Sequence, residues 1–446
     1  MVLINVHIGL DSVDSPFGGC TTHASYLVLK GLVSRFGQDL EFIDYPNLVR
    51  LNPAIPFKTR GNGAVVLRVR TAVSNIDNLV RTVTSIVKGY LKLLGGSSQP
   101  GIAIYLGSEV PNVLRRMYLK ALTDYVHRDF LTRAISELGD RVILPLGVSR
   151  GVIGALASIG GLVNEDCTYE LIVYRSWDNT VNPTRCVDEG SIKIMDQKYM
   201  EYTFLNYDYE RGRALVSPHG PDPVLLGIRG EDPLTLVDAL KSVDICEDVS
   251  GWVIFRTNQG ANPHHSILRS VNDVRPYQAG CVEGRVTGKP RVLRGGDVVL
   301  TISDGGCSVR AAVFRETGMT SVSRELISGD EVRACGVFKH WSGIGVVLHV
   351  EKMFVNPVNL VRYLNPRCSV CGARMKSAGR GKGWKCVKCG FRTLNAEKEV
   401  IVIRRDQLRG HYIPKDSAIK HLVKPLRRYG REKLCSMTRP KGAWFR

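Results

Sequence analysis

The segment INVHIGLDSVDSPFGGCTT, residues 4–22, decides the fold expected for the amino-terminal half of the chain. Apolar residues alternate at Ile4, Val6, Ile8 and Leu10, which is the period of a half-buried β-strand. A loop with two acids and two glycines follows, and an apolar pattern of helical period begins at Thr22. A strand that runs through such a loop into a helix predicts an α/β unit.

The same loop has the composition of a phosphate site. Gly18 and Gly19 allow the backbone to approach a phosphate, and the N-terminus of the following helix offers free N–H groups and positive potential. The hydroxyls of Thr21 and Thr22 can contact phosphate or cap the helix. An acidic turn with a capping threonine explains these residues without a ligand, so the pattern alone leaves both interpretations open.

Two carboxylates and a second loop sharpen the prediction. Asp11 and Asp14 border the first loop, where carboxylate oxygens can hold Mg²⁺. The second loop, KTRGNG, contains Lys58, Arg60 and Asn62 directly before a predicted strand, and such side chains neutralise and bind phosphates. Alone this would be an ordinary basic turn. Together the two loops predict an ATP site.

The periodicity of the chain predicts a multidomain α+β protein. Strands at 64–69 and 102–106 and helices at 75–94 and 113–138 complete an α/β domain over residues 1–138. Residues 139–265 show the order strand, helix, strand, strand, helix, strand of a ferredoxin-like unit, with elements at 141–144, 151–159, 168–174, 223–228, 233–243 and 252–256. A polar insertion occupies residues 176–220 of this unit.

The remaining sequence changes to short strands separated by glycine turns. Strands at 282–286, 298–302, 309–314, 331–337 and 344–354 predict an OB-fold β-barrel over residues 272–357. A generic small barrel would show the same pattern. A zinc segment at 364–393 and a basic C-terminal segment at 394–446 end the chain.

Four cysteines have the spacing of a zinc site. Cys368 and Cys371 form one C-x-x-C pair, Cys386 and Cys389 form another, and 14 residues separate the pairs. A glycine follows the second cysteine of each pair, where the chain must turn tightly. Four thiolates fill the tetrahedral coordination of Zn²⁺, so we expect a structural zinc ribbon rather than a catalytic metal.

The charge of the chain is strongly uneven. Of the formal net charge of +19, residues 362–446 contribute 23 Lys and Arg against 5 Asp and Glu, whereas residues 1–361 are nearly neutral. A local excess of this size is typical of a polyanion partner, although a solvated basic tail is the alternative. The expected RNA contacts are Arg380, Lys382, Trp384, Lys424, Arg427 and Arg428. Trp384 can stack on a base or pack under the zinc hairpin.

Composition limits the class of protein. With 44% hydrophobic residues and no apolar run of about 20 residues, the chain reads as globular and without a membrane association. The amino terminus lacks the features of a signal peptide, so we expect a cytoplasmic protein. The eight cysteines outside the zinc pairs are therefore expected to be reduced, small buried residues.

Six segments together resemble the archaeal tRNA agmatinylcytidine synthetases, which modify the CAU anticodon of an isoleucine tRNA. They are IGLDSVDSPFGGCTT (8–22), YPNLVRLNPAIPFKTRGNGAV (45–65), SPHGPDPVLLGIRGE (217–231), TNQG (257–260), the four-cysteine segment and HLVKPLRRYG (421–430). Taken singly, SPHGPDP and TNQG would be turns at a domain junction.

The resemblance implies a kinase-like first domain and an ATP-dependent ligase. Such an enzyme joins agmatine to carbon 2 of the wobble cytidine and splits ATP to AMP and pyrophosphate. It implies catalytic roles for Asp11, Asp14 and Thr21, the last as an autophosphorylated threonine, with ATP and Mg²⁺ at this site. It implies agmatine and isoleucine tRNA as partners, and we see no sign of an obligate protein partner.

The chain departs from the family pattern inside the acidic loop. Ser12 and Val13 stand where the family has Asp and Thr, which removes one carboxylate from the expected metal site. Two alternatives therefore stay open. One is a non-catalytic tRNA-binding protein with a decayed kinase-like domain, and the other is a ligase of the same architecture that uses another amine or tRNA.

Overall fold

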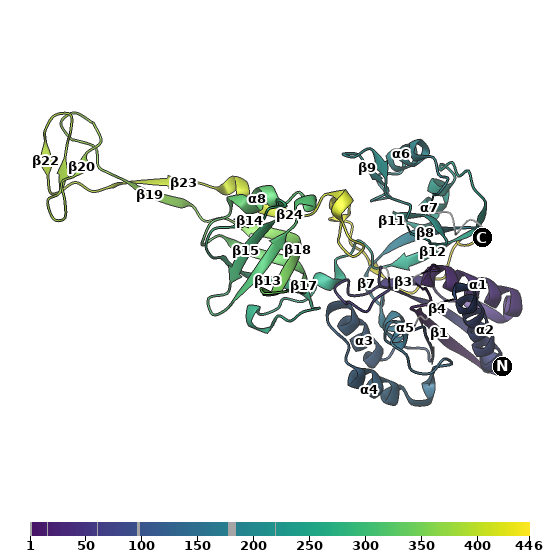
Figure 1. Cartoon of the computed structure of the whole chain (residues 1–446). Helices are drawn as coiled ribbons and strands as arrows, with labels where there is room; N and C mark the ends of the chain where they lie inside the picture. The colour runs from purple at the N-terminus through teal and green to yellow at the C-terminus, as the bar shows by residue number, and fades with distance from the viewer. Residues whose placement is uncertain (1, 16, 60, 96–98, 177–183, 219) are drawn as a thin grey trace.

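The computed structural model describes residues 2–15, 17–59, 61–95, 99–176, 184–218 and 220–446. Figure 1 shows a mixed α/β body that carries both chain ends, a β-barrel beside it, and an arm that extends away from the barrel. The predicted multidomain α+β organisation is therefore confirmed.

One continuous sheet runs through the body. Its strand order is β11-β8-β12-β3-β4-β1-β5-β6, with β2 paired to β4. The parallel pair β12–β3 joins the two halves of this sheet. The strands are β1 (Leu3–Asp11), β2 (Leu40–Phe42), β3 (Asn47–Arg50), β4 (Gly63–Ala72), β5 (Gly101–Leu106), β6 (Val142–Ile143), β8 (Thr168–Arg175), β11 (Val224–Gly230) and β12 (Val249–Thr257).

Helices cover both faces of the amino-terminal half-sheet. Successive side chains of β4 point to opposite faces, so Leu67 packs in one apolar core and Val66 in the other. The first core is completed by α1 (Thr21–Phe36) and α2 (Ile76–Leu94), and the second by α3 (Asn112–Thr123), α4 (Arg128–Leu138) and α5 (Gly151–Gly160). The strands and helices predicted before residue 138 are present, and β3 is an element that the pattern did not predict.

Two elements at the start of the expected ferredoxin-like unit pack against the amino-terminal half of the sheet. β6 pairs with β5, and α5 packs against β1, β5 and α3. A glycine on each element permits the close approach of β1 and α5. A Cβ on Gly9 of β1 would lie 2.1 Å from the Ala155 carbonyl oxygen, and one on Gly154 of α5 would lie 2.0 Å from Asp11 Oδ2.

The carboxy-terminal half of the sheet consists of β8, β11 and β12. It packs on α7 (Pro233–Leu240) and on α6 (Glu189–Lys198), which lies inside the expected polar insertion together with β9 (Tyr207–Asp208) and β10 (Arg213–Ala214). A buried ion pair crosses the junction of the halves: Arg256 Nη2 lies 2.5 Å from Asp44 Oδ2, and both side chains are fully buried. This pair holds β12 beside the segment before β3.

The barrel contains the five predicted strands. Its strands are β13 (Ala279–Val286), β15 (Val298–Ser303), β16 (Ser308–Val313), β17 (Glu331–Trp341) and β18 (Gly345–Asn356), with the short β14 (Arg291–Val292) and α8 (Thr320–Glu325). Pairing of β13 with both β17 and β15 closes the sheet. Alternate residues such as Val298, Leu300 and Ile302 fill the interior.

The arm, residues 360–403, is a two-stranded ribbon that ends in a small three-stranded sheet (Figure 1). The ribbon pairs β19 (Leu360–Leu364) with β23 (Glu399–Ile403), and the tip contains β20 (Lys376–Ser377), β21 (Trp384–Lys385) and β22 (Arg392–Thr393). The tip contains the predicted zinc segment.

The strap, residues 410–446, returns from the arm to the body. Its β24 (Gly410–Tyr412) adds to β18 of the barrel, and its β25 (Leu434–Cys435) pairs with β7 (Glu165–Asp166) of the body. Near its end the Arg446 amide donates to the Trp252 carbonyl at 2.9 Å. The residues expected to form a separate basic C-terminal segment are therefore mostly part of the fold.

Three disulfides contradict the expectation of reduced cysteines. They join Cys167 to Cys435, Cys186 to Cys246, and Cys281 to Cys335. The members of each pair are 54 to 268 residues apart, so spacing along the chain could not show that the fold brings them together. None of the described helices has the length and apolar character needed to cross a bilayer.

Candidate functional site

A cleft of about 940 Å³ opens between the two halves of the body. Its walls come from the β1–α1 loop, the segment between β3 and β4, strands β8 and β11, and the strap. The polar and charged residues among its lining include Ser12, Asp14, Thr21, Thr22, Arg50, Lys58, Thr59, Glu170, Asp222, Arg229 and His421. The cleft thus brings together both loops that the sequence singled out.

The β1–α1 loop is held in shape by its own short side chains. Ser12 adopts a left-handed backbone conformation with φ of 56°, and its N–H donates to Asp11 Oδ1 at 2.8 Å. The Val13 N–H donates to Thr21 Oγ1 at 3.2 Å. Gly19 has φ of 82°, and a Cβ there would lie 2.6 Å from the Leu94 side chain. The loop therefore needs glycine at this position for steric reasons as well as for any ligand.

Asp11 and Asp14 are both buried at this loop. Burial raises the pKa of the Asp11 carboxyl to about 7, and the negative charge of Asp14 adds to the shift. Two mutually repelling carboxylates beside basic side chains are stabilised by a cation, so these residues fit Mg²⁺. Ser12 lies between them in the cleft wall and can add a hydroxyl oxygen.

The second predicted loop lies on the opposite wall. Lys58 is exposed to the cleft, and partial burial together with Lys339 and Lys420 lowers its pKa. Asn62 has φ of 51° and donates through Nδ2 to the Asn52 carbonyl at 2.7 Å, so its amide shapes the loop. Arg60 lies outside the described residues.

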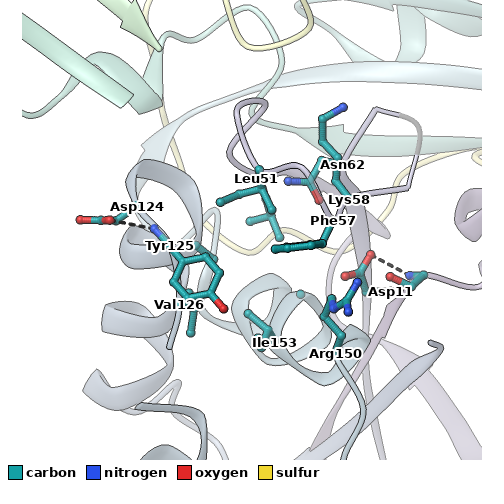
Figure 2. A pocket seen from close by; sticks show the side chains of 14 residues that line it. Asp11, Leu51, Phe57, Lys58, Asn62, Asp124, Tyr125, Val126, Arg150 and Ile153 are labelled. Atoms are coloured by element: carbon teal, nitrogen blue, oxygen red, sulfur yellow. Dashed lines mark hydrogen bonds between the residues drawn. The ribbon is translucent and has the colours of Figure 1, made fainter. Parts of the chain in front are cut away.

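A smaller pocket of about 110 Å³ adjoins the cleft (Figure 2). Asp11, Phe57, Lys58 and Arg150 meet there, and the Arg150 guanidinium lies 4.8 Å from the centre of the Phe57 ring. Phe57 is half exposed, and Figure 2 shows its ring between Lys58 and the α5 residue Ile153. An exposed aromatic ring with a cation on it is a surface on which a planar base can stack.

Four further cleft residues were not predicted from the sequence. Arg50 ends β3, Glu170 and Arg229 come from β8 and β11, and His421 comes from the strap. Arg229 Nε donates to Glu170 Oε1 at 3.1 Å. Arg50, Arg229 and His421 stand within segments that carry the family resemblance, but nothing in the local pattern marks them as residues of this cleft.

The TNQG segment has a clear structural role beside the cleft. Asn258 Oδ1 accepts from the Arg50 N–H, and Asn258 Nδ2 donates to the Arg50 carbonyl, both at 2.9 Å. Gln259 donates to Glu170. The segment therefore fixes one basic and one acidic residue of the cleft.

Two other residues of the cleft lining, His421 and Asp222, add a neutral imidazole and a carboxyl group. Nearby Arg50 and, less strongly, enclosure in the cleft hold the pKa of His421 well below its usual range, so this imidazole is neutral. Asp222, from the SPHGPDP segment, is buried and accepts the Val224 N–H at 2.9 Å. Cationic and anionic side chains thus face the same space.

The four predicted zinc cysteines converge at the tip of the arm. Their sulfur atoms all lie within 4.8 Å of one another. Cys368 Sγ lies 3.5 Å from Cys389 Sγ, and Cys371 Sγ lies 3.4 Å from Cys386 Sγ. Thiolates around zinc stand roughly 3.8 Å apart, so the set fits a tetrahedral ion after a small expansion.

The expected RNA contacts separate into two groups. In the arm, Arg380 and Lys382 are exposed, and Trp384 is half-buried against the cysteine cluster. In the strap, Arg427 is partly exposed and lies 3.4 Å from Asp196.

The expectation for the other two strap residues is corrected. Arg428 is 1% exposed, with ion pairs to Asp166 at 2.9 Å and to Glu231. Lys424 is buried and pairs with Glu432 at 2.7 Å. These cations already have anionic partners inside the protein, and an RNA phosphate could not reach them without breaking those pairs.

Comparison with known proteins gives the family. Family models match residues 7–79 (TiaS TCKD domain), 149–264 (TiaS FLD domain) and 365–406 (TiaS C-terminal zinc ribbon domain). The isoleucine-tRNA 2-agmatinylcytidine synthetase TiaS of Ignisphaera aggregans is 40% identical over 439 residues, which cover 96% of this chain and 94% of that protein. The same enzyme of Staphylothermus marinus is 41% identical over 440 residues, with the same coverage.

Solved structures agree with the sequence comparison. A complex of TiaS with its isoleucine tRNA and ATP superposes with a TM-score of 0.79 at 34% identity, covering 95% of this chain and 97% of that one. A complex of TiaS with the same tRNA, AMPCPP and agmatine gives a TM-score of 0.77 at 31% identity with the same coverage. The chain belongs to the TiaS family of isoleucine-tRNA 2-agmatinylcytidine synthetases.

Proposed function

We propose that this protein is an ATP-dependent ligase that joins agmatine to carbon 2 of the wobble cytidine in the CAU anticodon of isoleucine tRNA. The observation that carries the proposal is the cleft between the two halves of the body. It combines a phosphate-type loop, three carboxylates and three arginines in a fold shared with relatives solved with isoleucine tRNA, ATP and agmatine.

The ATP phosphates are held between the two predicted loops. Cys20, Thr21 and Thr22 at the N-terminus of α1 face them from one side, and Lys58 with Arg50 from the other. Gly18 and Gly19 precede these residues in the turn and shape it. Asp11 and Asp14 would hold Mg²⁺, which would offset the charge that develops on the transferred phosphoryl group. Thr21 accepts a phosphoryl group on its hydroxyl oxygen. The Val13 N–H donates to this oxygen and holds it at the N-terminus of α1.

Activation of the cytosine explains the need for ATP. The oxygen on carbon 2 is a poor leaving group until it is phosphorylated. ATP supplies this phosphoryl group. The amine nitrogen of agmatine then bonds to carbon 2 and gives up a proton, the bond between carbon 2 and the oxygen breaks, and the oxygen leaves as part of the released phosphate. Because agmatine is a dication, we expect it to bind on the side of the cleft that contains Asp222. The cytosine reaches the cleft by leaving the anticodon loop, where unstacking costs little.

The other parts of the fold bind the tRNA. We assign the body to a kinase-like and a ferredoxin-like domain and the closed barrel to the OB-fold class. The arm carries a structural zinc ion on its four cysteines and presents Arg380, Lys382 and Trp384 to the RNA.

The test is mass analysis of the anticodon nucleotide after incubation with ATP, Mg²⁺, agmatine and isoleucine tRNA. The expected product is cytidine with agmatine in place of the oxygen on carbon 2. Thr21→Ala should give no product, whereas Thr59→Ala, a hydroxyl on the opposite wall, should keep most of the activity. Unmodified cytidine with wild-type protein would favour the non-catalytic RNA-binding alternative. Product with putrescine but not agmatine would instead show a different amine specificity.

A further inference from the structure

Two adjacent histidines and a glutamate meet where the body joins the barrel. His264 Nε2 lies 2.8 Å from Glu351 Oε2, and His265 Nε2 lies 3.1 Å from the same oxygen. The two imidazole rings lie side by side with centroids 3.8 Å apart. The histidines come from the turn that follows β12, and Glu351 comes from β18, so the cluster crosses the junction.

The cluster is enclosed, and its imidazoles are not saturated by hydrogen bonds. The side chains of His264, His265 and Glu351 are 0%, 1% and 4% exposed. Within the part of the chain that the structure describes, neither Nδ1 atom has a hydrogen-bond partner. The candidate ligand atoms of the two histidines and Glu351 all lie within 4.8 Å of one another.

Glu351 is the residue that both histidines share, and its two oxygens have different partners. Oε2 lies at hydrogen-bond distance from both imidazoles. Its second oxygen, Oε1, accepts from Lys420 Nζ at 3.2 Å. This leaves Oε2 directed at the histidines while a lysine of the strap orients the group, as outer hydrogen bonds do for metal-bound carboxylates.

We propose that His264, His265 and Glu351 form a second metal site, separate from the four cysteines, that takes a zinc-class divalent ion. Two imidazoles and one carboxylate are a common ligand set for Zn²⁺, with bonds of about 2.0–2.1 Å. Ligand atoms at that bond length in a tetrahedral site stand roughly 3.3 Å apart. The two distances to Glu351 Oε2 are slightly shorter, so a small outward movement of the side chains admits the ion.

The ion would fasten the barrel to the cleft. His264 lies a few residues after TNQG, whose Asn258 holds Arg50 in the cleft wall. Glu351 lies on the barrel strand that also pairs with the strap. A metal bond between these segments fixes the position of the barrel, and therefore of the arm, relative to the cleft.

The test counts metal ions in the full-length protein. Native mass spectrometry and elemental analysis after loading with Zn²⁺ should give two zinc ions per chain. Glu351→Gln and His265→Ala should each retain one, and Cys371→Ser should lose the other. The matched control is His349→Ala on the same strand, since His349 bonds to Trp341 rather than to the cluster, and it should retain two.

Cobalt distinguishes the sites without any variant. The wild-type protein should bind two equivalents of Co²⁺, one with the near-ultraviolet thiolate charge-transfer band and one without it. Saturation at one equivalent with only the thiolate spectrum, or two zinc ions in Glu351→Gln, would overturn the proposal. The cluster would then be a hydrogen-bonded triad.

Discussion

The arm and the strap are neighbours in the sequence and equally basic in appearance, yet the structure uses their cations in opposite ways. In the arm, Arg380 and Lys382 are exposed on a tip that extends from the barrel (Figure 1). In the strap, Arg428 is buried between Asp166 and Glu231. The same local charge therefore serves as an external surface in one segment and as an internal link in the other.

The difference lies in partners that are distant along the chain. Asp166 and Glu231 lie about 200 or more residues before Arg428, in the body onto which the strap folds. The arm tip extends away from the body, and from Arg367 to Arg392 it has no acid of its own. Counting charges within a segment therefore overestimates the positive surface wherever that segment returns to the body.

The largest effect is expected from Arg428→Ala in the strap. It removes the buried guanidinium from two largely enclosed carboxylates, which keep only the longer contacts to Lys424 and Lys433, and it removes a hydrogen bond to the Gly260 carbonyl. Unfolding should therefore become easier by about 4 kcal/mol. Denaturant unfolding measures this. Arg380→Ala in the arm is the counterpart and should change stability by less than about 0.5 kcal/mol. Equal effects would remove the distinction between the segments.

Cys435→Ser should cause the next largest loss of stability. The disulfide to Cys167 closes a very long loop and ties the strap to the body, so its loss should cost about 3 kcal/mol. The wild-type protein with reductant should show at least this loss in a thermal unfolding experiment, because reduction also opens the other two disulfides. Cys307→Ser, at a free thiol, is the control. An unchanged transition in both conditions would mean that the strap does not depend on this bond.

Replacement of residues 365–398 by a short Gly-Ser turn isolates the arm tip. Leu364 and Glu399 are paired across the ribbon, so the turn rejoins the chain and keeps the strap. Affinity for isoleucine tRNA should fall about 100-fold at moderate salt, while binding of ATP alone persists. Truncation after residue 361 is a poorer test because it also removes the strap. Unchanged tRNA affinity would show that the arm is not an RNA contact.

The smallest change, in the affinity for tRNA and its dependence on salt, is expected from the double variant Arg380→Ala, Lys382→Ala. If both side chains contact phosphates, the slope of log affinity against log salt should decrease by roughly 1.5, with a several-fold weaker Kd at moderate salt. Titrations at three salt concentrations measure the slope. Lys88→Ala, an exposed lysine of α2, should leave it unchanged.

The sequence predicted what depends on local pattern. Strand alternation and cysteine spacing located the barrel, the amino-terminal helices and the zinc ligands, because each signal lies within a few residues. The β1–α1 loop and Lys58 were likewise placed correctly in one cleft.

The features that could not be predicted from the sequence depend on contacts between distant segments. His421 reaches the cleft only because the strap folds back, and the pairing of Cys167 with Cys435 spans 268 residues. The packing of the helix Gly151–Gly160 against β1 could not be predicted either, because the glycines that permit it appear in the sequence only as breaks in an apolar run. Local periodicity contains no information about which sheet a helix covers.

The central claim is that the two loops facing each other across the cleft bind the nucleotide. Crystals of the full-length protein soaked with ATP and Mg²⁺ test it most directly. We expect phosphate density between Thr21 and Lys58, with the ion beside Asp11 and Asp14. Nucleotide density remote from both loops would contradict the assignment of the cleft as the catalytic centre.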